Sequence, residues 1–262
     1  MKGKKLPANN CYVCCMVNII YKNKYMKTLR KQSLFLLAAL AIGTTCLAQT
    51  AEEIVNKSID AVGGKDAIAA VKSIVYTQTL EVAGNEVPSV TTIVAGKGWK
   101  LDIDYQGTKI VTVITDHGGW TVNPMMGSAT PTALPAEQVK QTEGRLNIVP
   151  LQGWSVNGGK LELQGKDSAD YKIHLTNTVG TDIVYYINLK TYLLDKQDMT
   201  GTVNGQTGTT TMHFGDYRKT DAGLLVAYSW VQELPQMSLT FTTKSVDVNK
   251  PVDPTVFDMP KN

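Results

Sequence analysis

The feature that most constrains the fold is a long succession of short strand-like segments that begins at Ser73. Segments such as SIVYTQTLEV, GWKLDIDYQ and KIVTVITD follow one another, with glycine-containing turns between them. Residues 101–105 read LDIDY, so apolar and acidic residues alternate with the period of a strand that has one apolar face. Strands joined by such short turns pair antiparallel. No strand–helix–strand rhythm occurs, which argues against a parallel nucleotide-binding sheet.

The number of strands predicts the shape of the sheet. The pattern indicates about eleven strands, and an antiparallel sheet of that size curls because its twist accumulates. Residues 125–159 interrupt the strands with loops, MMGSATPTALP among them, and with a short helix expected over 135–142. The sequence therefore predicts a mainly β fold with some α: a curled antiparallel sheet, or incomplete β-barrel.

Two short helices are expected ahead of the strands. Thr50 and Glu53 form a capping box, an apolar stripe follows, and Gly63 and Gly64 end the first helix. A second helix is expected over residues 66–71. Because an apolar stripe must be buried, we expect the helices to cover the concave face of the sheet and to leave a hydrophobic space beneath them.

The first 48 residues are expected to be absent from the mature protein. A basic stretch at 27–31 precedes nine apolar residues at 34–42, and small residues lead to Ala48. These are the parts of a secretory signal peptide, and the apolar run is too short to span a bilayer, which takes about 20 residues. We expect translation to start at Met26, a signal peptide over 26–48, cleavage between Ala48 and Gln49, and a single domain over 49–262. A genuine N-terminal extension over 1–25 is the alternative.

All four cysteines lie upstream of that cleavage site. Cys11, Cys14 and Cys15 fall in the segment expected to be untranslated, and supporting metal ligands at the usual spacing are missing. Cys46 raises a different question, because a lipoprotein signal ends at an acylated cysteine. Gly43 occupies the position that such signals give to leucine, which favours plain cleavage. Lipid anchoring through Cys46 is the alternative.

Removal of residues 1–48 reverses the sign of the net charge. All 23 acidic residues but only 18 of the 26 basic residues lie after Ala48, so the net charge changes from +3 to −5. An acidic surface with no basic cluster argues against nucleic acids and anionic membranes as partners. The remaining domain is large enough to be stable without disulfides, and we expect a monomer.

Four segments, taken in order, resemble one known family. They read AEEIVNKSIDAVGGKDAIAAVKSIVYTQTLEV, DHGGWTVNP, HFGDYRKTDAGLLVAYSW and VDVNKPVDPTVFDMP. This order is similar to that of periplasmic proteins of the lipoprotein-carrier superfamily in Gram-negative bacteria, the LolA/LolB-like group with its uncharacterised outer membrane lipoprotein-sorting relatives. The resemblance covers nearly all of 49–262. It implies an incomplete barrel, closed by helices, around a cavity that holds acyl chains.

The chain departs from that family at one residue type. The characterised carriers hold their lid with a buried arginine, whereas the only arginines after residue 48 here are Arg145 and Arg218. Arg145 lies in the mid-chain excursion and Arg218 lies in a late hairpin. Neither lies on an early strand, so the carriage of lipoproteins is less firmly implied than the fold.

The sequence shows no assembled catalytic or metal site. It contains no Gly-x-Ser-x-Gly elbow and no His-Glu-x-x-His pair. His117, His174 and His213 lie in different hairpins. Asp116 and His117 are adjacent, and neighbours on a strand point to opposite sides. We therefore predict a protein that is not an enzyme and has no metal and no cofactor.

The predicted function is that of a periplasmic binding or carrier protein that holds a lipid, an acyl chain or a lipoprotein. The mechanism is burial, which stabilises a bound chain by roughly 0.8 kcal/mol per methylene group. A lid is expected from residues 51–71 or 125–159. The residues expected to line the cavity are Tyr76, Leu101, Ile103 and Tyr105, with Trp99 and Met126 near its mouth.

The alternative hypothesis is a recognition or sensor module with the same fold. Its cavity would be filled by its own side chains, and its partner would be an envelope or outer membrane protein. A separate motif, Asp167-Ser168-Ala169, resembles a short acceptor for periplasmic O-glycosylation. It falls in a predicted turn, so Ser168 is a candidate modification site.

Overall fold

The computed structural model describes residues 49–203, 206–234 and 237–260, and it shows one large antiparallel sheet in this part of the chain. Thirteen strands occur in the order β6-β5-β4-β3-β2-β1-β13-β12-β11-β10-β9-β8-β7. Two consecutive meanders, β1 to β6 and β7 to β13, are joined at the centre, where β1 pairs with β13. Strands β6 and β7 are the two edges, so the sheet is not closed into a barrel.

The strands have the following bounds. The first meander contains β1 (Ser73–Val82), β2 (Asn85–Val94), β3 (Gly98–Tyr105), β4 (Thr108–Thr115), β5 (Gly118–Asn123) and β6 (Ser128–Ala133). The second contains β7 (Lys160–Asp167), β8 (Asp170–Thr176), β9 (Asp182–Asn188), β10 (Leu194–Val203), β11 (Gln206–Lys219), β12 (Leu225–Leu234) and β13 (Met237–Val248).

The helices are short. They are α2 (Ala51–Ala61), α3 (Gly64–Ala70) and α4 (Ala136–Thr142), with 3-10 turns η1 (Pro124–Met126), η2 (Glu143–Leu146), η3 (Val156–Gly158) and η4 (Pro254–Phe257). The capping box of α2 is present: the backbone N–H of Glu53 donates to the Thr50 hydroxyl at 3.2 Å, and the Thr50 N–H donates to the Glu53 carboxylate at 3.1 Å. Among these described segments, no helix is long and apolar enough to cross a membrane.

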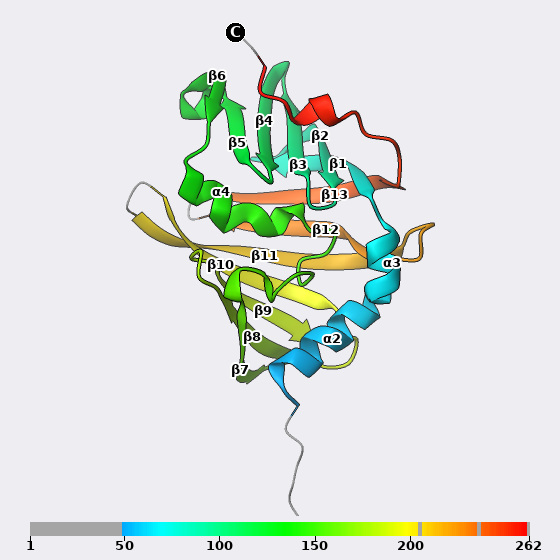
Figure 1. The fold of residues 1–262 in the computed structure, drawn as a ribbon. Helices are drawn as coiled ribbons and strands as arrows, with labels where there is room; N and C mark the ends of the chain where they lie inside the picture. The colour runs from blue at the N-terminus through cyan, green and yellow to red at the C-terminus, as the bar shows by residue number, and fades with distance from the viewer. Residues whose placement is uncertain (1–48, 204–205, 235–236, 261–262) are drawn as a thin grey trace, which may run out of the picture. The chain divides into compact units, whose positions relative to one another are not determined.

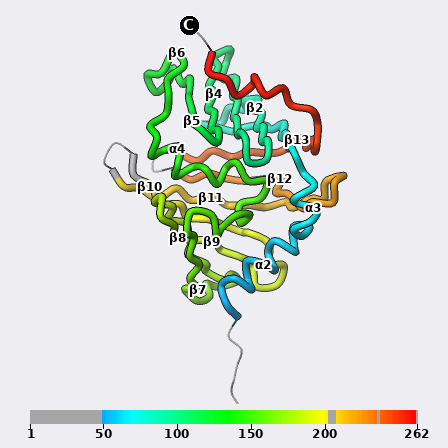
Figure 2. The backbone as a smooth tube through the Cα atoms, in the orientation of Figure 1, coloured from blue at the N-terminus to red at the C-terminus, as the bar shows by residue number. Residues whose placement is uncertain are grey.

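The helices lie over one face of a strongly curled sheet. Figure 1 shows the strand direction turning from nearly vertical in β4 and β5 to nearly horizontal in β11 and β12, with α4 and α2 in front. The backbone tube shows the chain leaving β6, crossing that face through α4 and continuing to β7 (Figure 2). Fully buried Ile54 and Val55 of α2 share one apolar core with Ile74 of β1 and Ile173 of β8. The core therefore lies between the helices and the concave face.

The predicted fold class is confirmed, and the sheet has thirteen strands where the sequence predicted about eleven. Residues 128–133 were expected to be loop but form β6. Pro131 lies in this strand, and β6 tolerates it because an edge strand leaves one row of its backbone groups unpaired. The helix expected over 135–142 is present as α4, and the helix expected over 66–71 begins two residues earlier, at Gly64. The expectations about residues 1–48, Cys46 included, lie outside the described residues.

Candidate ligand-binding cavity

A cavity of about 290 Å³ lies between the concave face of the sheet and the elements that cover it. Its wall comes from two blocks of strands, β1 to β3 and β9 to β12. Its cover comes from α2 and from residues 141–151, which we call the covering segment. Most of the lining is apolar. The cavity is thus built from both meanders, and β1 and β13 hold the two meanders side by side.

Strand register explains which side chains of the first meander reach the cavity. Tyr76 on β1 pairs with Thr91 on β2, and Thr91 pairs with Leu101 on β3. Residues directly opposite one another in an antiparallel pair share a face of the sheet. The next pair of β2 and β3 on this face is Ile93 with Trp99. All five side chains line the cavity.

The covering segment is held mainly by apolar burial. Four of its own apolar side chains are buried: Leu146, Ile148, Val149 and Leu151. Two long-range hydrogen bonds tie the segment to the sheet: in the turn between β2 and β3, the Gly96 N–H donates to the Leu146 carbonyl at 2.9 Å, and on β9 the Tyr185 hydroxyl donates to the Pro150 carbonyl at 3.5 Å. Because these polar attachments are few, the segment is held in place chiefly by its buried apolar side chains.

The cavity wall carries one charge. Among the described residues that line it, Arg145 of η2 is the only charged one. The carbon atom at the centre of its guanidinium lies 4.5 Å from the centroid of the Trp99 ring, which is the geometry of a cation–π contact. Burial lowers the pKa of the guanidinium from its ordinary value, although an arginine remains protonated near neutral pH. The cavity therefore presents a positive group in apolar surroundings.

Three tyrosines on the wall indicate a water-poor environment. Burial raises the pKa of Tyr76, Tyr185 and Tyr217 well above the ordinary tyrosine value, so all three are neutral. The Tyr217 hydroxyl donates to the Leu194 carbonyl at 2.7 Å. The Tyr76 hydroxyl, by contrast, makes no hydrogen bond to any residue that the structure describes. A ligand can therefore gain a hydrogen bond from Tyr76 without displacing another partner.

A short polar row crosses the apolar wall. The Thr91 hydroxyl donates to the side-chain oxygen of Gln78 at 3.0 Å, and the Gln78 side-chain nitrogen lies 3.2 Å from the Thr243 hydroxyl, to which it donates. All three residues are buried, and Gln78 and Thr91 line the cavity. Sequence reasoning did not single out this row. The sequence feature that could have indicated it is a polar residue, Gln78, at an inward position of β1 between the inward residues Tyr76 and Leu80.

The structure separates the residues that the sequence proposed for the cavity. Tyr76, Trp99 and Leu101 line it together. Ile103 and Tyr105 lie further along the same face of β3 and pack near buried Phe241 in a second cluster. That cluster fills the space at this end of the strand.

Met126 lies elsewhere, in η1 between β5 and β6, where it is 82% exposed. The structure places it on a hairpin tip and not in the cavity lining. Sequence reasoning also missed the second block of wall strands, including Met199, Met212 and Phe214, and it missed Arg145 as a cavity residue. Whether any of the proposed residues contacts a ligand remains a prediction.

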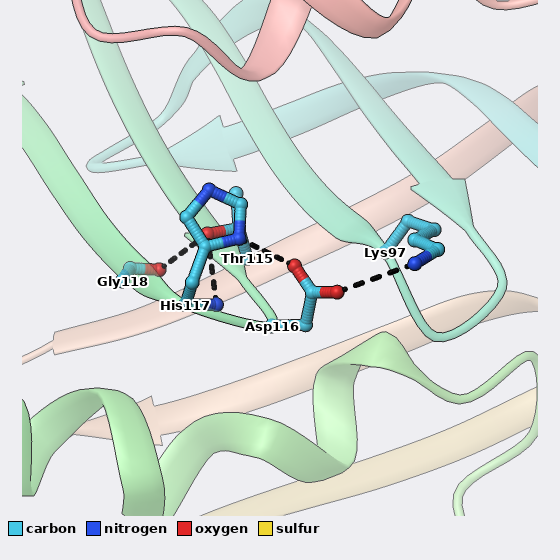
Figure 3. Close-up of polar contacts among 5 residues, drawn as sticks. All are labelled: Lys97, Thr115, Asp116, His117 and Gly118. Carbon is cyan, nitrogen blue, oxygen red and sulfur yellow. Dashed lines mark hydrogen bonds and ion pairs between the residues drawn. The ribbon is translucent and has the colours of Figure 1, made fainter.

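Asp116 and His117, which are adjacent in the sequence, lie in a turn. Asp116 and His117 connect β4 to β5, and their side chains approach to 2.6 Å because a turn does not alternate its side chains as a strand does. Lys97 lies 3.4 Å from the same carboxylate, and Thr115 and Gly118 complete the contacts of the turn (Figure 3). The His117 side chain is 85% exposed. Within the described ranges, no group of three His, Cys, Asp or Glu residues could hold a metal.

Comparison with known proteins supports the fold. No protein-family model and no curated protein matches the chain. A LolA superfamily protein from Nitrosomonas europaea superposes with a TM-score of 0.53 at 12% identity, covering 82% of this chain and 99% of that one. A putative outer membrane lipoprotein-sorting protein domain from Vibrio parahaemolyticus gives a TM-score of 0.54 at 12% identity, covering 79% and 97%. The resemblance inferred from the sequence is thus confirmed at the level of architecture: the chain has the fold of LolA superfamily proteins.

Proposed function

We propose that the protein is a non-enzymatic periplasmic binding or carrier protein that shelters an apolar chain, such as the acyl chain of a lipid or lipoprotein. One observation carries this proposal: a mostly apolar cavity of about 290 Å³, not filled by the protein's own side chains, lies between the concave face of the sheet and its cover. The LolA-like fold supports it, and so does the signal-peptide pattern over 26–48.

The cavity has the size and lining for a single chain. Ligand cavities usually measure roughly 300–1,000 Å³ and are mostly apolar with a few polar groups, so this cavity lies just below that range. Each methylene group that leaves water for such a wall contributes about 0.8 kcal/mol. A chain of moderate length is therefore bound by burial alone, before the cost of ordering it.

Entry and release depend on the covering segment. Residues 141–151 close the cavity largely through buried apolar side chains, and a bound chain offers those side chains a replacement surface. Displacement of the segment from the sheet breaks the hydrogen bond from Gly96 to Leu146. In this mechanism the sheet stays rigid and the mid-chain excursion acts as the lid.

The competing hypothesis is a protein-recognition or sensor module whose cavity is filled by its own side chains. Under that hypothesis the space beneath the covering segment serves no ligand, and the partner is an envelope protein. The volume that remains in the cavity favours the binding protein.

A binding titration tests the proposal. We expect the delipidated protein, secreted from its natural host, to bind a fluorescent fatty acid saturably. Leu101→Asp places a carboxylate on the cavity wall and should abolish binding. The matched control is Val156→Asp, which makes the same kind of change at a side chain that is 60% exposed and outside the lining. Far-UV circular dichroism verifies that both variants fold. Absence of saturable binding by the unaltered protein rejects the proposal in favour of the recognition module.

A further inference from the structure

The cavity contains a positive charge that no described protein group neutralises. The other described arginine, Arg218, shows the usual solution: its side-chain nitrogens donate to the two Asp216 carboxylate oxygens at 2.9 and 2.6 Å. Arg145 has no such partner among residues 49–203, 206–234 and 237–260. It makes no ion pair there, and its side chain donates no hydrogen bond to any of them. Arg145 is half-buried, and a charge withdrawn from water is costly unless it is paired.

The contact with Trp99 leaves the donors of Arg145 available. A guanidinium carries five N–H donors that lie in its plane. Stacking over the Trp99 ring uses the face of that plane. The donors along its edge can therefore still form a fork of two parallel hydrogen bonds to an oxyanion such as a carboxylate or a phosphate.

A partner that neutralises Arg145 would have to come from outside the part of the chain that the structure describes. Apart from Arg145, the described residues that line the cavity include no charged side chain: no aspartate, no glutamate and no lysine. Its other polar members are amides, hydroxyls and tyrosines, which can complete the hydrogen bonding of a headgroup but cannot neutralise a cation. An apolar wall with one unpaired cation is complementary to a molecule with an apolar chain and one anionic end.

We propose that the cavity takes an amphiphile with a single acyl or alkyl chain and an anionic headgroup, a carboxylate or a phosphate, whose oxygens pair with Arg145. The chain lies along the wall formed by Tyr76, Leu101 and the strands of the second meander. This inference rests on the proposed function, because it names the class of ligand that the same cavity holds. It also assigns the covering segment a second task, since the lid itself carries the residue that recognises the headgroup.

Calorimetric titration of the delipidated protein with four compounds tests the inference. They are dodecanoate, its uncharged methyl ester, monododecyl phosphate and inorganic phosphate. We expect both chain-bearing anions to bind at least about tenfold more tightly than the ester, because charge-assisted hydrogen bonds are lost in the ester. Arg145→Gln should remove that preference while leaving the affinity for the ester unchanged. Arg218→Gln, the matched control, should keep it.

Other outcomes overturn the inference. Equal affinities of the unaltered protein for dodecanoate and its methyl ester would overturn it. An equal loss of affinity for both compounds in Arg145→Gln would also overturn it, because that result would mean that the arginine only holds the covering segment in place. Inorganic phosphate binding as tightly as monododecyl phosphate indicates a small-anion site instead. Arg145→Lys keeps the charge and should retain part of the preference, which guards against a folding defect in the glutamine variant. If no chain-bearing compound binds the unaltered protein, the proposed function fails as well, whereas equal binding of acid and ester rejects this inference alone.

Discussion

At the scale of single residues, the most informative side chain in the sheet is a serine without a partner. Ser89 on β2 is 2% exposed, and its hydroxyl finds no hydrogen bond among the described residues. A buried unpaired hydroxyl costs stability that an alanine does not. We expect Ser89→Ala to raise the free energy of unfolding by roughly 1 kcal/mol in urea denaturation. A loss of stability instead would mean that the hydroxyl has a partner.

Ser73 on β1 provides the matched control for that substitution. It is also buried, but its hydroxyl donates to the Lys250 carbonyl at 2.7 Å. Ser73→Ala should therefore lower the free energy of unfolding by about 1 kcal/mol. Both serines lie on neighbouring strands and are buried, but they face opposite sides of the sheet, because Ser89 pairs with Gln78 of the cavity wall and Ser73 pairs with Val94. The hydrogen bond from Ser73 to the C-terminal segment joins residues far apart in the sequence, so the local pattern does not reveal it.

At the scale of elements, the C-terminal turn η4 packs where β3 begins. A β-carbon added at Gly98 would lie 2.7 Å from the ring of Phe257, and the Phe257 carbonyl accepts a hydrogen bond from the Trp120 indole at 2.8 Å. We expect Gly98→Ala to displace this turn and to lower the free energy of unfolding by about 1–3 kcal/mol. Gly118→Ala is the control, because an added β-carbon meets nothing within 4 Å there. Urea denaturation that shows equal effects for the two variants would contradict the packing argument.

The hairpin of β7 and β8 makes stability depend on pH. Burial and then the neighbouring Asp195 carboxylate raise the pKa of Asp170 to about 6, from 3.8. The folded state therefore binds this proton more tightly than the unfolded state does. The stability that it contributes is fully present below pH 3.8 and is lost as the pH rises through about 6. Asp170→Asn should be more stable than the unaltered protein at pH 8, and the difference should shrink by pH 4.

The control for Asp170 is Asp221→Asn, an exposed aspartate in the turn between β11 and β12. Its effect on the urea midpoint should be small and similar at both pH values. A constant difference between Asp170→Asn and the unaltered protein from pH 8 to pH 4 would show that ionisation of Asp170 is not the cause.

Elements were predictable where their pattern is local. The helix beginning at Ala51 could be predicted because a capping box, an apolar stripe and a double glycine all lie within fifteen residues of sequence. Strand β6 could not, because SATPTA lacks alternation and contains a proline, and only its pairing with β5 makes it a strand.

At the scale of the whole molecule, the curled sheet could be predicted from the sequence but only half of the candidate site could. The first block of the wall lies on strands close in sequence, so alternation on β1 and β3 pointed to Tyr76 and Leu101. The second block reaches the cavity because β13 returns to pair with β1, a contact between the ends of the domain. Arg145 reaches it because the excursion folds back over Trp99. Neither of these long-range contacts produces a periodic pattern in the sequence.

The way the covering segment is attached to the sheet predicts which amides become protected from hydrogen exchange when a ligand binds. The covering segment is bound to the sheet by burial and few hydrogen bonds, so its amides should exchange with solvent faster than those of the central strands β1 and β13. A bound chain adds contacts beneath residues 141–151 and should slow their exchange. The β5–β6 hairpin, whose tip carries exposed Met126, lies outside the cavity lining and should not change.

Hydrogen exchange measured by mass spectrometry, with and without dodecanoate, decides between two pictures of the lid. If residues 141–151 are the moving part, protection appears there and is absent in Leu101→Asp, in which the chain cannot bind. If protection appears in α2 and α3 while 141–151 stay unchanged, the N-terminal helices are the gate. The headgroup contact with Arg145 would then form on a fixed wall and not on a closing one, because η2 would keep its place against Trp99 throughout.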